Sequence, residues 1–320
     1  MMDSKTVRFD MFAWQVTSWP ILRDDVRYLE TLDIGTVWLG DAYAMPPTHG
    51  GAVLEAWTTL AALAAHTTRV RLGTLISNVA LRHPAMLAKQ AATVDCISAG
   101  RLDLGIGPGE NQEAWLGLPS LAPGARVDRL AEAVEVIDRL LRDHRLSYQG
   151  SYYQLADAPL EPAPVQRPRP PLIIAAEGKR ALRIAARHAD VWVTIPAGRG
   201  TREEAVRSVR ERGQLFDEYC TALGRDPATV ERACVAGWGG PDAPFASADA
   251  LRDFIGRYRE AGVQRFIFCF GSAATPAPYD AWVAAGAWAN REVLDAFAAQ
   301  VITDLSNPNS PMPATPPTRG

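Results

Sequence analysis

The feature that most constrains the fold of this chain is a regular alternation of short apolar runs with segments of helical periodicity. The pattern repeats eight times along 320 residues. Strands that alternate with helices are typical of α/β proteins with a parallel sheet. The predicted strands are Val7 to Gln15, Thr36 to Leu39, Val70 to Ser77, Arg101 to Asn111, Leu172 to Ala176, Val191 to Ile195, Glu231 to Trp238 and Arg265 to Phe270.

Eight such units predict a (β/α)8 TIM barrel, in which functional groups follow the carboxyl ends of the strands. The alternative, a doubly wound open sheet, needs a glycine-rich turn after the first strand. Phe12 to Pro20 contains no glycine, so the barrel is favoured. The predicted helices are Ile21 to Leu32, Val53 to Ala65, Pro84 to Ile97, Arg126 to Leu141, Arg180 to His188, Thr201 to Leu223, Ala248 to Ala261 and Arg291 to Leu305.

Two segments break the alternation. The first, 146–171, holds three tyrosines and then six prolines, which predicts an inserted hairpin and a proline-stiffened arm after the fourth helix. The second, 306–320, has too few apolar residues to fold and is expected to be a disordered tail. We therefore predict one barrel domain over residues 1–305.

Composition excludes several classes of function. The net charge is −3 and the basic residues form no tract, so no nucleic-acid partner is expected. The N-terminus is too polar for a signal peptide and no apolar run is long enough for a membrane span, which predicts a cytoplasmic protein. The four cysteines form no CxxC pair and the five histidines no HExxH motif, so we expect no metal site.

The stretch from Arg101 to Asn111 is the most informative strand. Gly105, Gly107 and Gly109 stand at alternate positions, where another backbone or a flat ligand can come close. Glu110 is the one acid at its exit. If a flat cofactor and an apolar substrate cover this carboxyl group, desolvation would raise its pKa and make it a general acid. The alternative is an ordinary turn with a solvated Glu110.

Other strand ends offer further candidates. Ala176, Glu177, Gly178 and Lys179 lead into a helix, whose free N–H groups could bind a phosphate. Asp41 could accept a hydrogen bond from a ring N–H or stabilise a loop, and Asn78 could reach a heteroaromatic edge or cap the next helix. Five aromatic residues could line a substrate pocket or pack in the core. They are Trp14, Tyr43, Trp115, Trp192 and Trp238.

These motifs resemble the bacterial luciferase-like flavin-dependent oxidoreductases, a superfamily of (β/α)8 barrels that use FMN or the deazaflavin coenzyme F420. The resemblance runs from about Val7 to Leu305. It is carried by RVRLGT at 69–74, LRHP at 81–84, QAATVD at 90–95, SAGR at 98–101 and LGIGPG at 104–109.

The resemblance implies specific roles for several residues. The family's non-prolyl cis peptide, which props the flavin ring, matches Leu75 and Ile76, and its cofactor phosphate site matches residues 176–179. Glu110 matches a proposed proton donor of the sugar-phosphate dehydrogenases in the F420 branch. Ala42 stands where members with a catalytic histidine carry it, and His49 is at best a displaced substitute. No basic cluster for a sugar phosphate is evident.

Three functions follow from the resemblance. The first is an oxidoreductase that transfers hydride between reduced F420 and a small apolar or aromatic substrate, with Glu110 as the acid. The second is an FMN-dependent monooxygenase that needs O2 and a partner flavin reductase. The third is a non-catalytic flavin-binding accessory protein, which Ala42 keeps open. A homodimer through the alanine-rich helix Leu54 to Ala65 is also expected.

Overall fold

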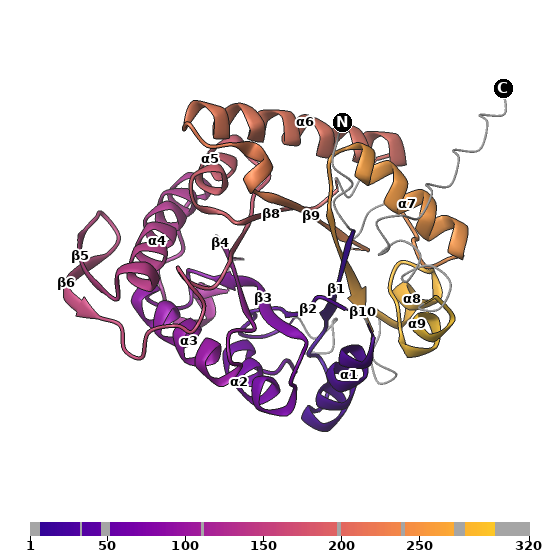
Figure 1. Ribbon diagram of the computed structural model, residues 1–320, viewed down its shortest axis with the longest axis horizontal. Helices are drawn as coiled ribbons and strands as arrows, with labels where there is room; N and C mark the ends of the chain where they lie inside the picture. The colour runs from indigo at the N-terminus through magenta and orange to yellow at the C-terminus, as the bar shows by residue number, and fades with distance from the viewer. Residues whose placement is uncertain are drawn as a thin grey trace.

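A closed parallel barrel forms the centre of the molecule. The computed structural model describes residues 7–32, 34–45, 52–109, 112–196, 200–237, 241–271 and 279–297. Within these ranges, eight strands close in the order β1-β10-β9-β8-β7-β4-β3-β2 (Figure 1). The predicted TIM barrel is confirmed. Its strands are β1 (Arg8–Ala13), β2 (Thr36–Leu39), β3 (Arg71–Asn78), β4 (Leu102–Gly107), β7 (Leu172–Ala175), β8 (Val191–Thr194), β9 (Glu231–Ala236) and β10 (Arg265–Phe270).

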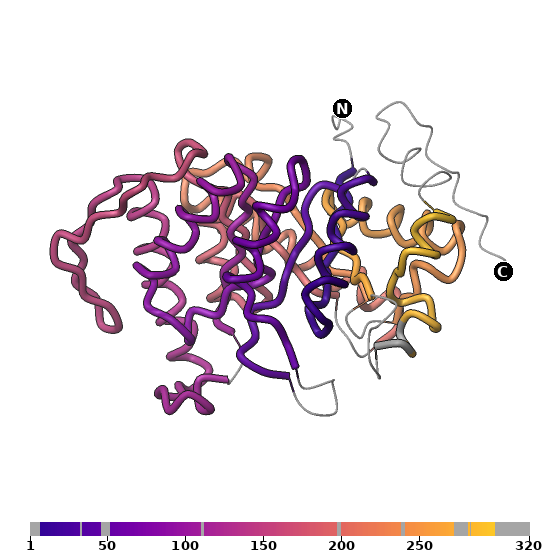
Figure 2. Tube along the Cα trace, turned by 90° about the horizontal axis from the view of Figure 1, so that it is seen from below, coloured from indigo at the N-terminus to yellow at the C-terminus, as the bar shows by residue number. Residues whose placement is uncertain are grey.

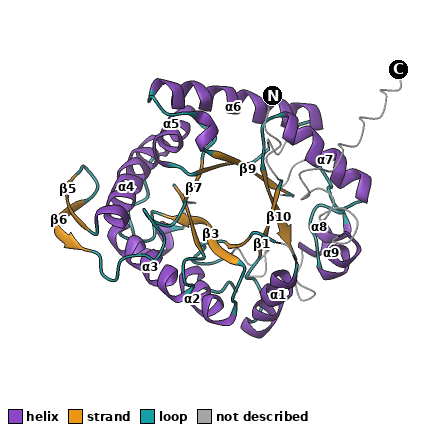
Figure 3. Ribbon diagram, viewed as in Figure 1, coloured by secondary structure: helices purple, strands orange, loops and turns teal. Residues whose placement is uncertain are grey.

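Helices surround the strands on the outside (Figure 3). Helix α3 has the predicted bounds, whereas α4 begins at Pro123 rather than Arg126, because a proline is well suited to the first helical turn. Helix α8 was not predicted, and residues 298–320, including the expected tail, lie outside the described residues. The helices are α1 (Trp19–Thr31), α2 (Ala56–His66), α3 (Pro84–Ile97), α4 (Pro123–Asp143), α5 (Lys179–His188), α6 (Arg202–Ala222), α7 (Ala248–Glu260), α8 (Tyr279–Ala284) and α9 (Arg291–Phe297).

The insertion is a hairpin followed by an arm. Strands β5 (Arg145–Gln149) and β6 (Gln154–Pro159) pair antiparallel and project from the barrel beside α4 (Figure 2). The Glu132 carboxylate on α4 holds the turn, because it accepts N–H groups of Ser151 at 2.8 Å and Tyr152 at 2.9 Å. The predicted hairpin and proline-rich arm are therefore present.

Two groups of buried side chains make up the core. The larger group lies between the strands and the helices. The second group fills the inside of the barrel, where side chains at every second strand position point inward. On β8, for example, Val191 and Val193 belong to this inner group.

Charged side chains close the amino-terminal end of the barrel. Arg265, the first residue of β10, is 2 % exposed and pairs with Asp10 and with Asp103, the latter at 3.0 Å. Thr36 accepts a hydrogen bond from the same guanidinium at 2.8 Å. Burial alone lowers the Arg265 pKa, but the carboxylates outweigh it and raise that pKa. This end of the barrel is therefore filled, which leaves the carboxyl-terminal end for a site.

Within the described part of the chain, no helix is both long enough and apolar enough to cross a membrane.

Candidate active site

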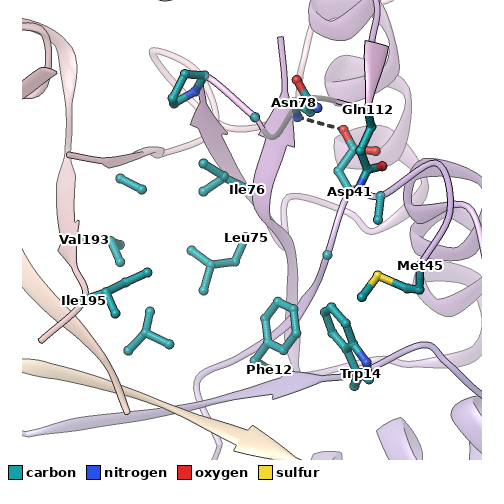
Figure 4. Close-up of a pocket in the computed structure, with 16 residues that line it drawn as sticks. Phe12, Trp14, Asp41, Met45, Leu75, Ile76, Asn78, Gln112, Val193 and Ile195 are labelled. Atoms are coloured by element: carbon teal, nitrogen blue, oxygen red, sulfur yellow. Dashed lines mark hydrogen bonds between the residues drawn. The ribbon is translucent and has the colours of Figure 1, made fainter. Parts of the chain in front are cut away.

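A pocket of about 290 Å³ opens at the carboxyl-terminal end of the barrel (Figure 4). Its walls come from the ends of β1, β3, β7, β8 and β9 and from the loops after β2 and β4. Most of its surface is apolar. The lining residues are Phe12, Trp14, Gly40, Asp41, Ala42, Met45, Leu75, Ile76, Asn78, Pro108, Gly109, Gln112, Ala175, Val193, Ile195 and Val235.

A non-prolyl cis peptide joins Leu75 and Ile76 in the middle of this wall. The cis bond expected from the family resemblance is therefore present at the predicted pair. Both side chains point into the cavity, toward Val193 and Ile195 (Figure 4). The pairing of β3 with β4 is irregular here, and a Thr74–Ser77 hydroxyl contact of 2.7 Å spans the irregular segment.

The alternate glycines of β4 face this irregular segment of β3. A Cβ at Gly105 would overlap the Thr74 carbonyl oxygen, and one at Gly107 would overlap the Ile76 side chain. A Cβ at Gly109 would overlap the Asn78 side chain in the same way. The space that these glycines leave is thus filled by β3. The packing of a flat ring against these glycines stays a prediction; of the three, Gly109 lines the pocket.

Asp41 supports the backbone at the end of β3. Its side chain is 2 % exposed and forms an ion pair with Arg82, whose Nη2 lies 2.9 Å from Oδ1. The same carboxylate accepts the Asn78 N–H at 2.9 Å. Of the two roles predicted for Asp41, loop stabilisation is the one that these contacts display. Arg82 was missed, because its partner lies far away in the sequence.

Asn78 and Gln112 provide the other polar side chains of the described wall. The Asn78 Oδ1 accepts the Ala80 N–H at 2.8 Å, so it shapes the loop after β3 and does not cap α3. His83 is the cap, since its Nδ1 accepts the Ala85 N–H at 3.2 Å. Gln112 Oε1 accepts the Tyr43 N–H at 2.6 Å and so joins the loops after β2 and β4.

The structure describes four of the five predicted aromatic residues, and one of these, Trp115, is 56 % exposed and not part of the lining. Trp14 lines the pocket, as predicted. Trp192 does not, because it lies on the outer side of β8, stacks on Phe216 at 4.8 Å and donates Nε1–H to the Ala176 carbonyl at 2.8 Å. Tyr43 is 55 % exposed and is not part of the lining. Trp238 lies outside the described residues, as do His49 and the predicted acid Glu110.

The predicted phosphate site lies directly beside the pocket. Ala175 lines the cavity, and Ala176 donates its N–H to the Val193 carbonyl at 3.1 Å. Gly178 is the N-cap of α5, makes no side-chain cap and faces open space. The first N–H groups of a helix attract anions, so residues 176–179 suit a phosphate attached to a ligand in the pocket.

The described residues offer no metal site, and the two cysteines of the barrel strands β9 and β10 are not activated. No group of three or more His, Cys, Asp or Glu side chains in this part of the chain could hold a metal ion. Burial raises the pKa of the Cys269 thiol inside the barrel and of Cys234 outside it. Both thiols therefore stay protonated at neutral pH.

Fold and site together define a TIM-barrel protein with an apolar pocket at the face where such barrels carry active sites. The chain belongs to the luciferase-like monooxygenase family, whose model matches residues 15–231.

Two relatives are both named F420-dependent glucose-6-phosphate dehydrogenase. The protein from Microbacterium testaceum is 36 % identical over 52 % of this chain and 49 % of its own length, so the match spans about half of that relative. The protein from Kineococcus radiotolerans is 35 % identical over 65 % of each chain. A solved F420-dependent secondary alcohol dehydrogenase, with an F420-acetone adduct, has a TM-score of 0.72 at 20 % identity and covers 91 % of this chain and 99 % of its own. That structural likeness shows the fold.

Proposed function

We propose that the protein is an oxidoreductase that transfers hydride between coenzyme F420 and a small, uncharged apolar or aromatic substrate. The observation that carries the proposal is the apolar pocket, with its cis Leu75–Ile76 peptide, beside the open N-terminus of α5. The F420-dependent relatives favour F420 over FMN.

The residues present fit such a cofactor. Leu75 and Ile76 would support the flat ring, and the backbone N–H groups of residues 177–179 would hold the phosphate, since Ala176 donates its own N–H to Val193. Gly178 leaves the N-terminus of α5 open for this, because a Cβ at that position would meet no atom within 4 Å. When bound, the cofactor supplies the two-electron chemistry, and the protein supplies binding, orientation and exclusion of water.

The chain contributes an apolar enclosure around the reacting atoms. Phe12, Met45 and Val235 line the cavity, and such walls exclude water that would compete for protons. Ala42 lines the same cavity and carries no proton-transfer group. We therefore assign the proton to Glu110, which follows the pocket residue Gly109. A pH–rate profile that is unchanged in Glu110→Gln would contradict this assignment.

The pocket favours an uncharged substrate over a sugar phosphate. Its polar side chains, among the described residues, are Asp41, Asn78 and Gln112, and none of the lining residues is basic. Arg82 already neutralises Asp41. Phosphate groups are bound by Arg, Lys or free N–H groups. The pocket itself therefore lacks the charge that a second phosphate, on the substrate, would need.

Titration of the purified protein with F420 and with FMN tests the cofactor assignment. We expect tighter binding of F420. Reduced F420 should then be oxidised by an apolar ketone or enone, which is detected as the return of the visible absorbance and fluorescence of the oxidised deazaflavin. A glucose-6-phosphate control should give no turnover. Tighter binding of FMN together with oxygen uptake by the reduced complex would instead establish the monooxygenase. Binding without turnover of any substrate would establish the accessory protein.

A further inference from the structure

Glu177 places a negative charge at the predicted phosphate site. It stands between the pocket residue Ala175 and Gly178, the N-cap of α5. Its side chain is 56 % exposed, and its Oε1 lies 3.6 Å from Nη1 of Arg212. A carboxylate at this point is unexpected, because a bound phosphate is also an anion.

Arg212 is a fixed cation at the same place. It reaches from α6 to the end of β8, where it donates to the Ile195 carbonyl at 2.9 Å and to the Thr194 hydroxyl. Ser208 accepts a further hydrogen bond at 3.1 Å, and the side chain is only 16 % exposed. Since Ile195 lines the pocket, the guanidinium is held next to the pocket wall by contacts that do not involve Glu177.

The neighbouring arginine is already occupied. Arg180, in the first turn of α5, pairs with Asp128 and donates to the Gly124 carbonyl at 3.2 Å, both on α4. A phosphate at the N-terminus of α5 would therefore meet the helix N–H groups, Lys179 and Arg212, with Glu177 among them. The Glu177 carboxylate and the phosphate carry charges of the same sign, and their repulsion raises the free energy of the bound state.

We infer that Glu177 weakens the binding of the cofactor phosphate, because its carboxylate repels that phosphate and neutralises Arg212. The inference rests on the proposed function, which places a phosphate-bearing cofactor in this pocket. It makes Glu177 a residue that sets cofactor affinity. A low affinity would suit a cofactor that carries hydride and has to dissociate from the protein to be reduced again.

The test compares ligands with and without the phosphate. Dissociation constants of wild type and Glu177→Gln are measured by fluorescence for FMN and riboflavin, which differ by the phosphate alone, and for F420 and the ribityl deazaflavin that lacks both the phosphate and its tail. We expect Glu177→Gln to bind the phosphate-bearing form about five- to tenfold more tightly at low salt. The affinity for the phosphate-free form should change less than about twofold.

Two controls separate this local effect from a change in net charge. Glu211 precedes Arg212 on α6 and is exposed, so Glu211→Gln removes the same charge at a neighbouring but solvent-facing position. It should leave the affinity for both forms unchanged. The gain in Glu177→Gln should also shrink as salt is raised toward 1 M, because the Debye length falls to about 3 Å. Thermal unfolding checks that both variants fold.

The outcomes distinguish this inference from the proposed function. If the wild type binds the phosphate-bearing cofactors and Glu177→Gln leaves their affinity unchanged, or shifts both forms equally, the inference is wrong and the proposed function stands. If neither wild type nor variant binds F420 or FMN, both are wrong.

Discussion

Gly107 of β4 faces Ile76 of β3 so closely that a Cβ at position 107 would overlap the Ile76 side chain. Ile76 follows the cis peptide and lines the pocket. The absence of a side chain on one strand therefore fixes where the neighbouring strand presents its side chain to the cavity.

Gly107→Ala should displace Ile76 and so weaken cofactor binding by about tenfold or more. Overpacking of this kind also costs about 1–3 kcal/mol in the free energy of unfolding. Gly256→Ala on α7 is the matched control, because its Cβ would meet no atom within 4 Å. It should stabilise the protein by about 0.5–1 kcal/mol and leave cofactor affinity unchanged. Equal affinities for the two variants would show that Ile76 does not contact the cofactor.

Asp41 and Arg82 offer a test of positioning against direct ligand contact. If Asp41 acts by holding Asn78 and pairing with Arg82, then Asp41→Asn and Arg82→Gln should each weaken cofactor binding by about 1–2 kcal/mol. The double variant should be little worse than either single variant, since both remove one interaction. Fluorescence titration of all four proteins measures this cycle. Normal affinity in Arg82→Gln would instead favour direct contact between Asp41 and the cofactor.

The Arg265–Asp103 pair predicts how the barrel responds to acid. Burial alone raises the Asp103 pKa, but Arg265 and Arg71 outweigh it and hold that pKa below its ordinary value. A carboxyl group with a lowered pKa stabilises the fold above its unfolded pKa of about 4 and loses this contribution as the pH falls further. Denaturant titrations should therefore show a free energy of unfolding that drops steeply below about pH 4.

The same pair predicts a large effect of Asp103→Asn at neutral pH. Removal of this carboxylate leaves the buried Arg265 incompletely paired, which should cost about 3–5 kcal/mol at pH 7. The acid-induced drop should also become smaller, because one titrating group is lost. Asp157→Asn is the control, since the Asp157 side chain is 67 % exposed in its pair with Arg145, and stability should barely change. An unaltered acid profile in Asp103→Asn would contradict this account.

The sequence predicted the barrel because its signals are local. Each strand and helix has its own spacing of apolar residues, and residues such as Pro84 mark where a helix begins. The cis pair came from the family resemblance and is present. Contacts between residues that are distant in the chain could not be predicted from the sequence. Asp41 and Arg82 come from different strand ends, and the β4 glycines gave no sign of whether a strand or a ligand faces them. The predicted homodimer stays a prediction.

The sequence leaves Trp192 open between the pocket and the core, because a strand that is buried on both faces shows no apolar–polar alternation. In β8 all four residues, Val191 to Thr194, are buried, so the sequence could not reveal which of them point inward. The structure assigns Val193 to the pocket and Trp192 to the contact with Phe216.

Trp14 and Trp192 should therefore respond in opposite ways to substitution. Trp14→Leu replaces a pocket-lining side chain by a smaller one and so enlarges the pocket. It should change the KM of the organic substrate severalfold when this is measured at a saturating concentration of cofactor. Trp192→Phe keeps the stacking on Phe216 but leaves the buried Ala176 carbonyl without its 2.8 Å hydrogen bond. It should lower the free energy of unfolding by about 1–3 kcal/mol while the KM stays near that of wild type. A KM that rises in Trp192→Phe as much as in Trp14→Leu would return Trp192 to the pocket.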